Sequence, residues 1–478
     1  MSRLSQKNKR LLWFVFFTTV FTYSLLAYLK LVDYLLQGTL FAYVMDGHPY
    51  VKDFCNVYNA SLLAERCLHG HVDIYDRAVQ DASLRSIIKP VVPELPFYLQ
   101  YPPCFFALLL PLSLFSLSQA WVVWVTLGGL LIAITTPLLL AQSDYKTRTD
   151  KIMAVALTFA AYPTWLSYTL GQTSLYTYPA VVYLLSRLLV GKGFSSGLAG
   201  IWAFVKLQYA PVLLLAGAIR GKLHFMAGAA VAVLFLLLLS IGVLGVDNVV
   251  GYPHVLLSGE TGSNVSGVSA EAMQNIRGFL TLLMVPSAIV SKIAMVCFLL
   301  SLPLVAWLWF KVYPWEQHSP RRFQLFSSLS LLIALAASPH THSQDYMLAS
   351  IVCIWIWINF PASGSDLASQ SPLASPSQSP SASASGTVGS AAFRAMTLRF
   401  LTMAFIPYGW VTFICGQFLN AFKTALPAHS PLNGIFLVLL PPVPPLLLWN
   451  IVVQILLFQE IFSKQKQAES VEVKSVEA

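Results

Sequence analysis

The chain has 478 residues, of which 56% are hydrophobic and only 10% charged, and its formal net charge is +9. A soluble protein carries about a quarter charged residues, so this composition excludes an ordinary soluble domain and predicts an all-α polytopic membrane protein. The apolar runs are too long for barrel strands, and the positive charge lies mostly in short loops and ends, so no nucleic-acid partner is implied.

Basic loops orient the predicted spans. Residues 1–10 are basic and predict a cytoplasmic start, and residues 11–32 predict a first span that no signal-peptide cleavage site follows. A long polar segment, 46–100, then forms the first external loop. The next apolar run, 103–117, is short and contains Pro111, which predicts an interfacial half-helix.

The remaining apolar runs bring the expected count to about ten spans. They cover residues 119–141, 152–169, 175–190, 223–246, 289–311, 323–338, 346–360, 396–418 and 433–458. Residues 192–222 have basic residues at both ends and Lys206 in the middle, which predicts a re-entrant, broken helix pair whose tip lies inside the protein.

Composition also divides the chain. Residues 1–361 predict a membrane core. Residues 362–390 are rich in Ser, Ala and Pro and predict a disordered cytoplasmic linker. Residues 391–460 predict a C-terminal helix pair, and 461–478 a cytoplasmic tail.

Most polar segments able to carry chemistry fall on one side of the membrane in this topology. They are the first external loop, the turn at 171–174, the loop 247–278, which a short helix at 279–287 follows, and the turn at 340–345. A single site that faces away from the cytoplasm explains this arrangement better than an alternating-access pathway does.

Asp53 is the first candidate for catalysis. A carboxylate at the membrane surface suits a general base acting on a lipid-borne substrate, because one carboxylate suffices to accept the proton of an attacking hydroxyl. Asp46 and Asp76 are rivals in the same loop, and Asp53 could instead cap a helix that begins near Asn56.

Lys206 is the second candidate. An ammonium group deep in an apolar segment is costly, so it pairs with an anion or faces a cavity. A substrate phosphate is the partner we expect, and Gln208 would add hydrogen bonds to phosphate or sugar. The alternatives are snorkelling to the interface and a salt bridge to a carboxylate elsewhere in the chain.

Further polar residues near span ends are candidate substrate contacts. His340 or His342 could contact the leaving phosphate or a sugar hydroxyl, and Arg277 could contact the phosphate; the alternatives are helix capping and interfacial anchoring. Gln172 could bind sugar, while Gly171 before it serves the backbone of a turn.

Neither a metal site nor a redox centre is predicted. Asp73 and Asp76 are separated by hydrophobic residues, and His340 and His342 lack the i, i+3 or i, i+4 spacing of helical ligands. Cys55, Cys67 and Cys104 lie in or beside the first external loop. They allow one disulfide on an oxidising side, or three unpaired thiols.

Several short motifs occur in an order that resembles a known family. They are Asp53-Phe54, Tyr58-Asn59-Ala60, Tyr75-Asp76 after Gly70, Tyr101-Pro102-Pro103, Gly171-Gln172, Lys206-Leu207-Gln208, and Ser338-Pro339 before His342. Over about residues 40–350 this order resembles glycosyltransferase family 87 of the GT-C superfamily. One departure is the absence of an aromatic residue between Ser338-Pro339 and the histidines.

The resemblance implies a GT-C-like helical bundle in the cell membrane. It implies transfer of a hexose, mannose above all, from a polyprenyl-phosphate donor to a glycolipid or glycan on the extracytoplasmic face. Asp53 would be the catalytic base, Tyr101 would join the substrate contacts, and no cofactor would be needed. A transporter or flippase of polyprenyl-linked sugars is the alternative; it predicts polar residues on both faces and internal repeats, which the sequence does not display. A non-catalytic envelope scaffold is a third option and would leave Lys206 unexplained.

Overall fold

The computed structural model describes most of the predicted core. The described residues are 52–88, 98–143, 147–203, 205–206, 209–261, 273–283, 285–312, 319–360, 394–402 and 449–461, with single positions at 22, 25, 26, 28, 29, 405 and 447. Within them the fold is helical, as the composition predicts, with one isolated bridge between Met273 and His342. The predicted first span, the linker 362–390 and most of the last two spans lie outside these residues.

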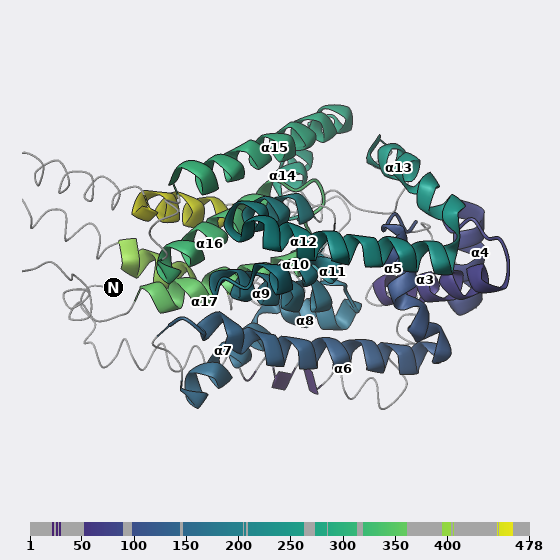
Figure 1. Ribbon diagram of the computed structural model, residues 1–478, viewed down its shortest axis with the longest axis horizontal. Coiled ribbons are helices and arrows are strands. Elements are labelled where there is room, and N and C mark those ends of the chain that lie inside the picture. The colour runs from purple at the N-terminus through teal and green to yellow at the C-terminus, as the bar shows by residue number, and fades with distance from the viewer. Residues whose placement is uncertain are drawn as a thin grey trace, which may run out of the picture.

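The described helices form the body of the molecule (Figure 1). Their bounds are α3 Lys52–His69, α4 Arg77–Ile88, α5 Pro103–Leu109, η2 Leu110–Leu114, α6 Leu117–Thr135, η3 Thr136–Leu140, α7 Arg148–Ala160, α8 Tyr162–Leu170, α9 Ser174–Leu189, α10 Gly193–Leu198, α11 Gly200–Ala203, α12 Ala210–Leu244, α13 Val246–Thr261, α14 Ile276–Leu282, α15 Ser287–Trp307, η5 Leu308–Val312, α16 Pro320–Ala337, η6 Ser343–Leu348 and α17 Ala349–Asn359.

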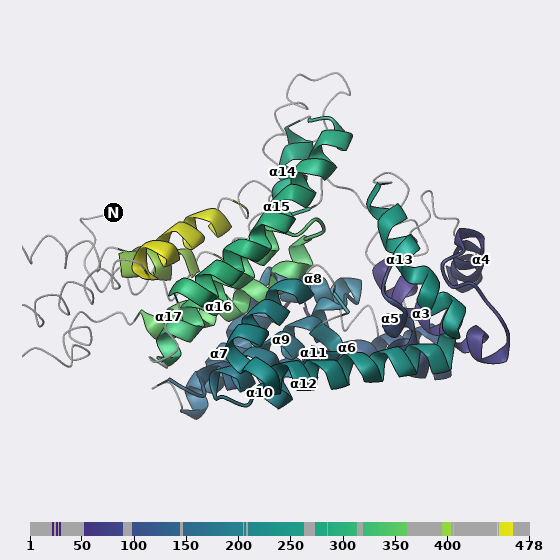
Figure 2. The same ribbon diagram turned by 45° about the horizontal axis from the view of Figure 1, so that its top comes forward.

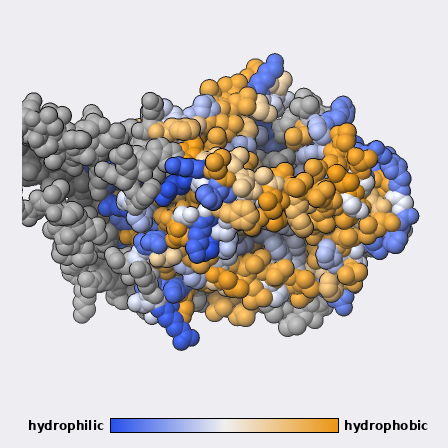
Figure 3. Space-filling view, viewed as in Figure 1, coloured by the Kyte–Doolittle hydropathy of each residue, from blue (hydrophilic) through white to orange (hydrophobic). Residues whose placement is uncertain are grey.

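Three segments among the described residues are long and apolar enough to cross a membrane. They are Leu117–Leu140, Ala210–Leu244 and Ser287–Phe310, and they contain most of the predicted spans 119–141, 223–246 and 289–311. Figure 3 shows a largely hydrophobic surface along α12 and α15, where exposed side chains such as Leu238 and Leu300 suit contact with lipid. The total of about ten spans stays a prediction.

The described residues 52–88 of the first external loop form two helices, α3 and α4. Helices α3 and α4 pack against each other, and α3 also packs against α5 and η2. Every side chain from Phe54 to Ser61 is buried, so protein surrounds this part of α3 on all sides. This end of the molecule also carries α13 (Figure 2), because Asn248 of α13 accepts from the Ile74 backbone N–H at 3.1 Å and donates to the Val72 carbonyl at 2.8 Å.

The loop predicted over 247–278 is therefore partly wrong, since its first part is helix α13. The short helix predicted at 279–287 is α14, which begins earlier. Asn275 caps α14, its side-chain oxygen accepting from the Gly278 backbone N–H at 2.9 Å, and this bond fixes where the helix starts.

The predicted span 152–169 is two shorter helices, α7 and α8. Ala161 between them has an extended backbone, with φ −67° and ψ 130°. Pro163 stands in the first turn of α8, where proline suits a helix start but cannot continue the helix before it. The next predicted span, 175–190, is α9, whose side chains are mostly buried and which contacts α6, α10 and α11.

The broken helix predicted over 192–222 is present. Helices α10 and α11 lead to Lys206, and α12 begins after it at Ala210. A second break, at Lys222 inside α12, falls where the predicted pair ends and the predicted span 223–246 begins; there the backbone has φ 49° and ψ −142°.

The cysteines and the C-terminal segment were also the subject of predictions. Cys55, Cys67 and Cys104 are all free thiols, which corresponds to the unpaired alternative. The last described helical segment, 449–461, packs on the core, because Asn450 donates to the Leu332 carbonyl and to the Tyr346 hydroxyl at 3.1 and 3.2 Å.

Candidate active site

The turn between α8 and α9 lies at the centre of the candidate site. Gly171 ends α8 in the left-handed conformation, with φ 63°. A Cβ at this position would lie 2.7 Å from the Cβ of Phe54, so both the backbone angle and the space require glycine. The predicted backbone role of Gly171 is confirmed, and the turn is pressed against α3 beside Asp53.

Asp53 and Gln172 meet at this contact although 119 residues separate them. The Gln172 side-chain amide donates a hydrogen bond to Oδ2 of Asp53. Asp53 lies in the first turn of α3, where the helix dipole favours a negative charge. The alternative role, a cap on a helix that begins near Asn56, is wrong, because α3 begins at Lys52 and Asp53 lies inside its first turn.

Tyr101 lies next to the middle of the same turn. Its ring stacks on Phe105 with centroids 4.1 Å apart. Burial raises the pKa of the Tyr101 hydroxyl well above its usual range; the neighbouring Thr173 side chain lowers it, and the carboxylates of Asp345 and Asp53 raise it further. The Tyr101 hydroxyl is therefore protonated at neutral pH and within electrostatic reach of both carboxylates.

Ser174, the first residue of α9 after the turn, joins a buried ion pair. The Lys206 ammonium pairs with Oδ1 of Asp345, and the two side chains are only 5% and 4% exposed. Ser174 Oγ accepts from Lys206 Nζ at 3.0 Å and donates to Asp345 Oδ1 at 3.1 Å. The His342 backbone N–H donates to Asp345 Oδ2 at 3.0 Å.

This ion pair changes the argument about Lys206. The sequence led us to expect a substrate phosphate as its partner, with a salt bridge to a distant carboxylate as the alternative, and the structure supplies that carboxylate. Burial by itself raises the pKa of Asp345, but the Lys206 ammonium, helped by the His342 N–H, outweighs burial and holds this pKa below its usual range. Burial of Lys206 is accordingly explained without a phosphate.

Two more polar segments pair beside this ion pair. The Gln274 backbone N–H donates to the Thr341 carbonyl at 2.7 Å, next to the bridge between Met273 and His342. The Thr341 hydroxyl is 3.1 Å from the hydroxyl of Tyr209, which lies three residues after Lys206. These contacts bring the loop before α14 and the turn before η6 to the same place as the α8–α9 turn.

Arg277 and His340 are neighbours in this part of the site. The Arg277 side chain is buried, and its Nη1 lies 3.5 Å from His340 Nε2. Asn275 holds the two segments together by donating to the Ser338 carbonyl at 2.7 Å. The site thus contains a cationic guanidinium beside an imidazole, apart from the Lys206–Asp345 pair.

Gln274 was missed by sequence reasoning. Its side chain is fully buried, and neither its amide nitrogen nor its amide oxygen has a hydrogen-bond partner among the described residues. Buried amides without partners are rare and point to a ligand or water that satisfies them. No sequence pattern distinguishes this glutamine.

Asp345 was seen at the end of the predicted turn but received no role. Its position directly before an apolar run was the available signal, since a carboxylate there needs a partner. Of the predicted site residues, the contacts above link Asp53, Tyr101, Gln172, Lys206, Arg277, His340 and His342. Gln208 lies outside the described residues.

A family model described as Glycosyltransferase family 87 matches residues 98–339, just over half of the chain. The matched region contains Tyr101, the α8–α9 turn, Lys206 and Arg277, and it ends just before His340. No curated protein and no solved structure matches the chain.

Proposed function

The chain belongs to glycosyltransferase family 87, and we propose that it transfers a hexose, mannose above all, from a polyprenyl-phosphate donor to a glycolipid or glycan acceptor. The transfer takes place on the extracytoplasmic face of the cell membrane. The observation that carries this proposal is the α8–α9 turn, where the Gln172 side chain reaches Asp53 and the Ser174 side chain reaches the Lys206–Asp345 pair.

Asp53 is the general base in this proposal. The acceptor hydroxyl oxygen attacks the anomeric carbon of the hexose, and the carbon–oxygen bond to the phosphate breaks with its electron pair remaining on the phosphate. The hydroxyl proton passes to the Asp53 carboxylate, which the Gln172 amide holds in place. One displacement of this kind inverts the anomeric configuration.

The leaving phosphate needs positive charge nearby. Arg277 and His340 are the groups best suited to offset it, because Arg277 is buried and its guanidinium is placed beside an imidazole that could also donate a hydrogen bond. Lys206 is a weaker candidate than the sequence suggested, since its charge is balanced by Asp345. Its proposed role is to fix the α8–α9 turn through its hydrogen bond to Ser174. A contact between Lys206 and the phosphate is not needed for this role.

The remaining polar groups of the site bind the sugar in this proposal. The buried Gln274 amide offers one donor group and one acceptor atom, and Tyr101 adds a hydroxyl that stays protonated. His342 lies in the turn whose backbone anchors Asp345. The reaction requires no cofactor or metal in this proposal, because these cations and hydroxyls supply the charge and the hydrogen bonds.

The test is transfer of label by the purified protein. Incubation with radiolabelled polyprenyl-phosphate mannose and a lipid extract from membranes should give a labelled glycolipid, and labelled polyprenyl-phosphate glucose should give far less. The anomeric configuration of the product, read by NMR, tests inversion. If the protein in proteoliposomes moves the intact donor across the bilayer and transfers no label, it is a flippase and the proposal is wrong.

A further inference from the structure

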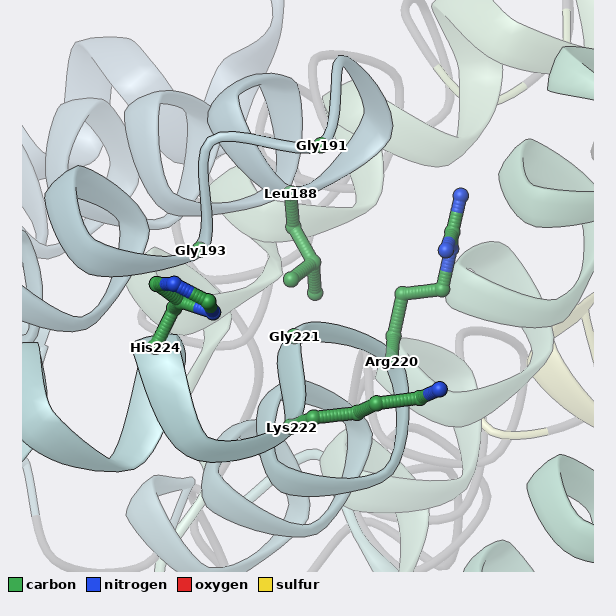
Figure 4. Close-up of a pocket in the computed structure, with 7 residues that line it drawn as sticks. All are labelled: Leu188, Gly191, Gly193, Arg220, Gly221, Lys222 and His224. Atoms are coloured by element: carbon green, nitrogen blue, oxygen red, sulfur yellow. The ribbon is translucent and has the colours of Figure 1, made fainter.

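A cavity lies at the other end of α9 from the catalytic turn. It has a volume of about 270 Å³ and is lined by Leu188, Gly191, Gly193, Arg220, Gly221, Lys222 and His224 (Figure 4). Helix α9 has 16 residues and spans about 24 Å at 1.5 Å per residue. The cavity is therefore separate from the site around Asp53.

The walls of this cavity are set by close backbone packing. A Cβ at Gly193 would lie 3.0 Å from the Gly221 carbonyl oxygen, and one at Gly197 would lie 2.3 Å from the Phe225 carbonyl oxygen. Helices α10 and α12 thus approach each other at distances that only glycine permits. A cavity bounded by backbone in this way cannot collapse through side-chain rearrangement.

Lys222 holds a strained backbone at the rim. It is the one non-glycine residue with positive φ among the described residues, at φ 49° and ψ −142°. Glycine adopts such angles easily and lysine does not, and residues held in strained conformations gather at ligand clamps and active sites. Here the strained position carries a cation rather than the glycine that the backbone favours.

The charge of the cavity is one-sided. Arg220, Lys222 and His224 surround the space in Figure 4, with Leu188 pointing into it. None of the described residues that line it is acidic. Two fixed positive charges and an imidazole favour an anion, and the volume is below the roughly 300–1,000 Å³ of pockets for drug-sized molecules. The cavity suits a small anionic group such as a phosphate.

Exposed apolar side chains close in sequence to the lining residues indicate the source of that phosphate. Leu223 is 83% exposed, and Phe194 and Met226 are exposed as well. Helix α12, which supplies Arg220 and Lys222, is a candidate membrane span over Ala210–Leu244. The charged lining thus belongs to a membrane helix with exposed apolar residues beside it, and basic pockets between membrane helices bind anionic lipid headgroups.

We propose that the cavity formed by the Gly191–Gly193 turn and the Lys222 break binds the phosphate headgroup of an anionic membrane lipid. The acyl chains of this lipid lie along the exposed apolar face of α12. This site is independent of the proposed transferase reaction, because no residue that lines it belongs to the site around Asp53.

Lys222→Gly is a sharp test, because it removes the charge and relieves the backbone strain together. Native mass spectrometry of the detergent-purified protein should show phosphatidic acid binding about fivefold weaker in Lys222→Gly than in the wild type, with a melting temperature that is unchanged or higher. Arg220→Gln combined with Lys222→Gly should weaken binding further. Lys151→Gln, which removes an exposed charge on α7 outside the lining, is the matched control and should bind like the wild type.

Three results would overturn the proposal. The first is phosphatidic acid binding by the double variant within twofold of the wild type. The second is equally tight binding of zwitterionic phosphatidylcholine by the wild type. The third is competition by inorganic phosphate at concentrations equal to those of the lipid, which would make free phosphate the occupant. Since Lys222→Gly favours the observed backbone, its test stands even if the double variant does not fold.

Discussion

Replacement of Lys206 by methionine tests the centre of the site. The variant leaves the Asp345 carboxylate, 4% exposed, without its cation. Removing one partner of a buried ion pair destabilises a protein by about 3–5 kcal/mol. The hydrogen bonds from Ser174 and the His342 N–H remain at 3.1 and 3.0 Å, so we expect the lower end of this range.

The double variant Lys206→Met with Asp345→Leu removes both charges but keeps side chains of similar volume. It therefore separates the effect of the unpaired charge from the effect of side-chain packing. Buried ion pairs replaced by apolar groups of similar volume are often neutral in stability. We therefore expect the double variant to recover most of the stability that Lys206→Met loses. The difference between the double variant and the sum of the single variants gives the coupling energy.

The stability of Lys206→Met should also depend on pH in a direction opposite to that of the wild type. In the wild type the pKa of Asp345 is held below its usual range, so its contribution is present above the unfolded pKa and is lost only in acid. Without Lys206, burial raises that pKa above its unfolded value. The variant is then most stable at low pH and loses stability as pH rises through the folded pKa.

Reversible unfolding in mixed micelles with increasing SDS, at about pH 5 and pH 8, measures these differences. Lys206→Met should be destabilised more at the higher pH. Its affinity for the donor should fall less than it would if Lys206 contacted the donor phosphate directly. If Lys206→Met is as stable as the wild type at both values, Lys206 is not paired with Asp345 in the membrane. A normal melting curve with lost donor affinity would restore the phosphate as its partner.

Three further changes test the surrounding residues. Gln172→Leu removes the donor that holds Asp53 and should lower kcat by about 10- to 100-fold with KM little changed; a kcat within threefold of the wild type would show that this contact does not position the carboxylate. Gln274→Met removes a buried amide that costs about 1–3 kcal/mol of stability while it is unsatisfied. The variant should therefore melt no lower than the wild type, while its KM for donor or acceptor rises. A lower melting temperature would mean that the protein itself satisfies the amide. Treatment with EDTA should leave transfer unchanged, and activity that disappears and returns with Mg²⁺ or Mn²⁺ would show that a metal takes part.

Some features of the site were predictable because they follow from local rules. Gly171 was expected to serve a turn, and its positive φ confirms this. Lys206 was expected at a helix break because basic residues flank its segment at both ends, and α11 and α12 do break there. Apolar length alone predicted the three long segments that can cross a membrane.

Other features depend on contacts that a single sequence does not specify. Asp345 lies 139 residues from Lys206, and hydrophobic periodicity cannot pair two such residues. The burial of α3 was equally hard to predict, because its residues from Phe54 to Ser61 are all buried, polar Asn56 and Asn59 among them, and no apolar period marks such a segment. The break at Lys222, by contrast, falls where the basic residues had already marked the end of the pair 192–222, although lysine normally continues a helix.

The most direct measurement is the turnover of Asp53→Asn beside Asp76→Asn. Both variants exchange a carboxylate for an amide, and Asp76, an exposed residue whose carboxylate accepts from the Ala78 N–H at 2.7 Å, is the matched control. With labelled polyprenyl-phosphate mannose, Asp53→Asn should lose at least about 100-fold in kcat at an unchanged melting temperature, within the range typical of a general base, while Asp76→Asn stays near the wild type. Near-normal turnover by Asp53→Asn would contradict the assignment of Asp53 as the base, and a large loss in Asp76→Asn would move that role to Asp76.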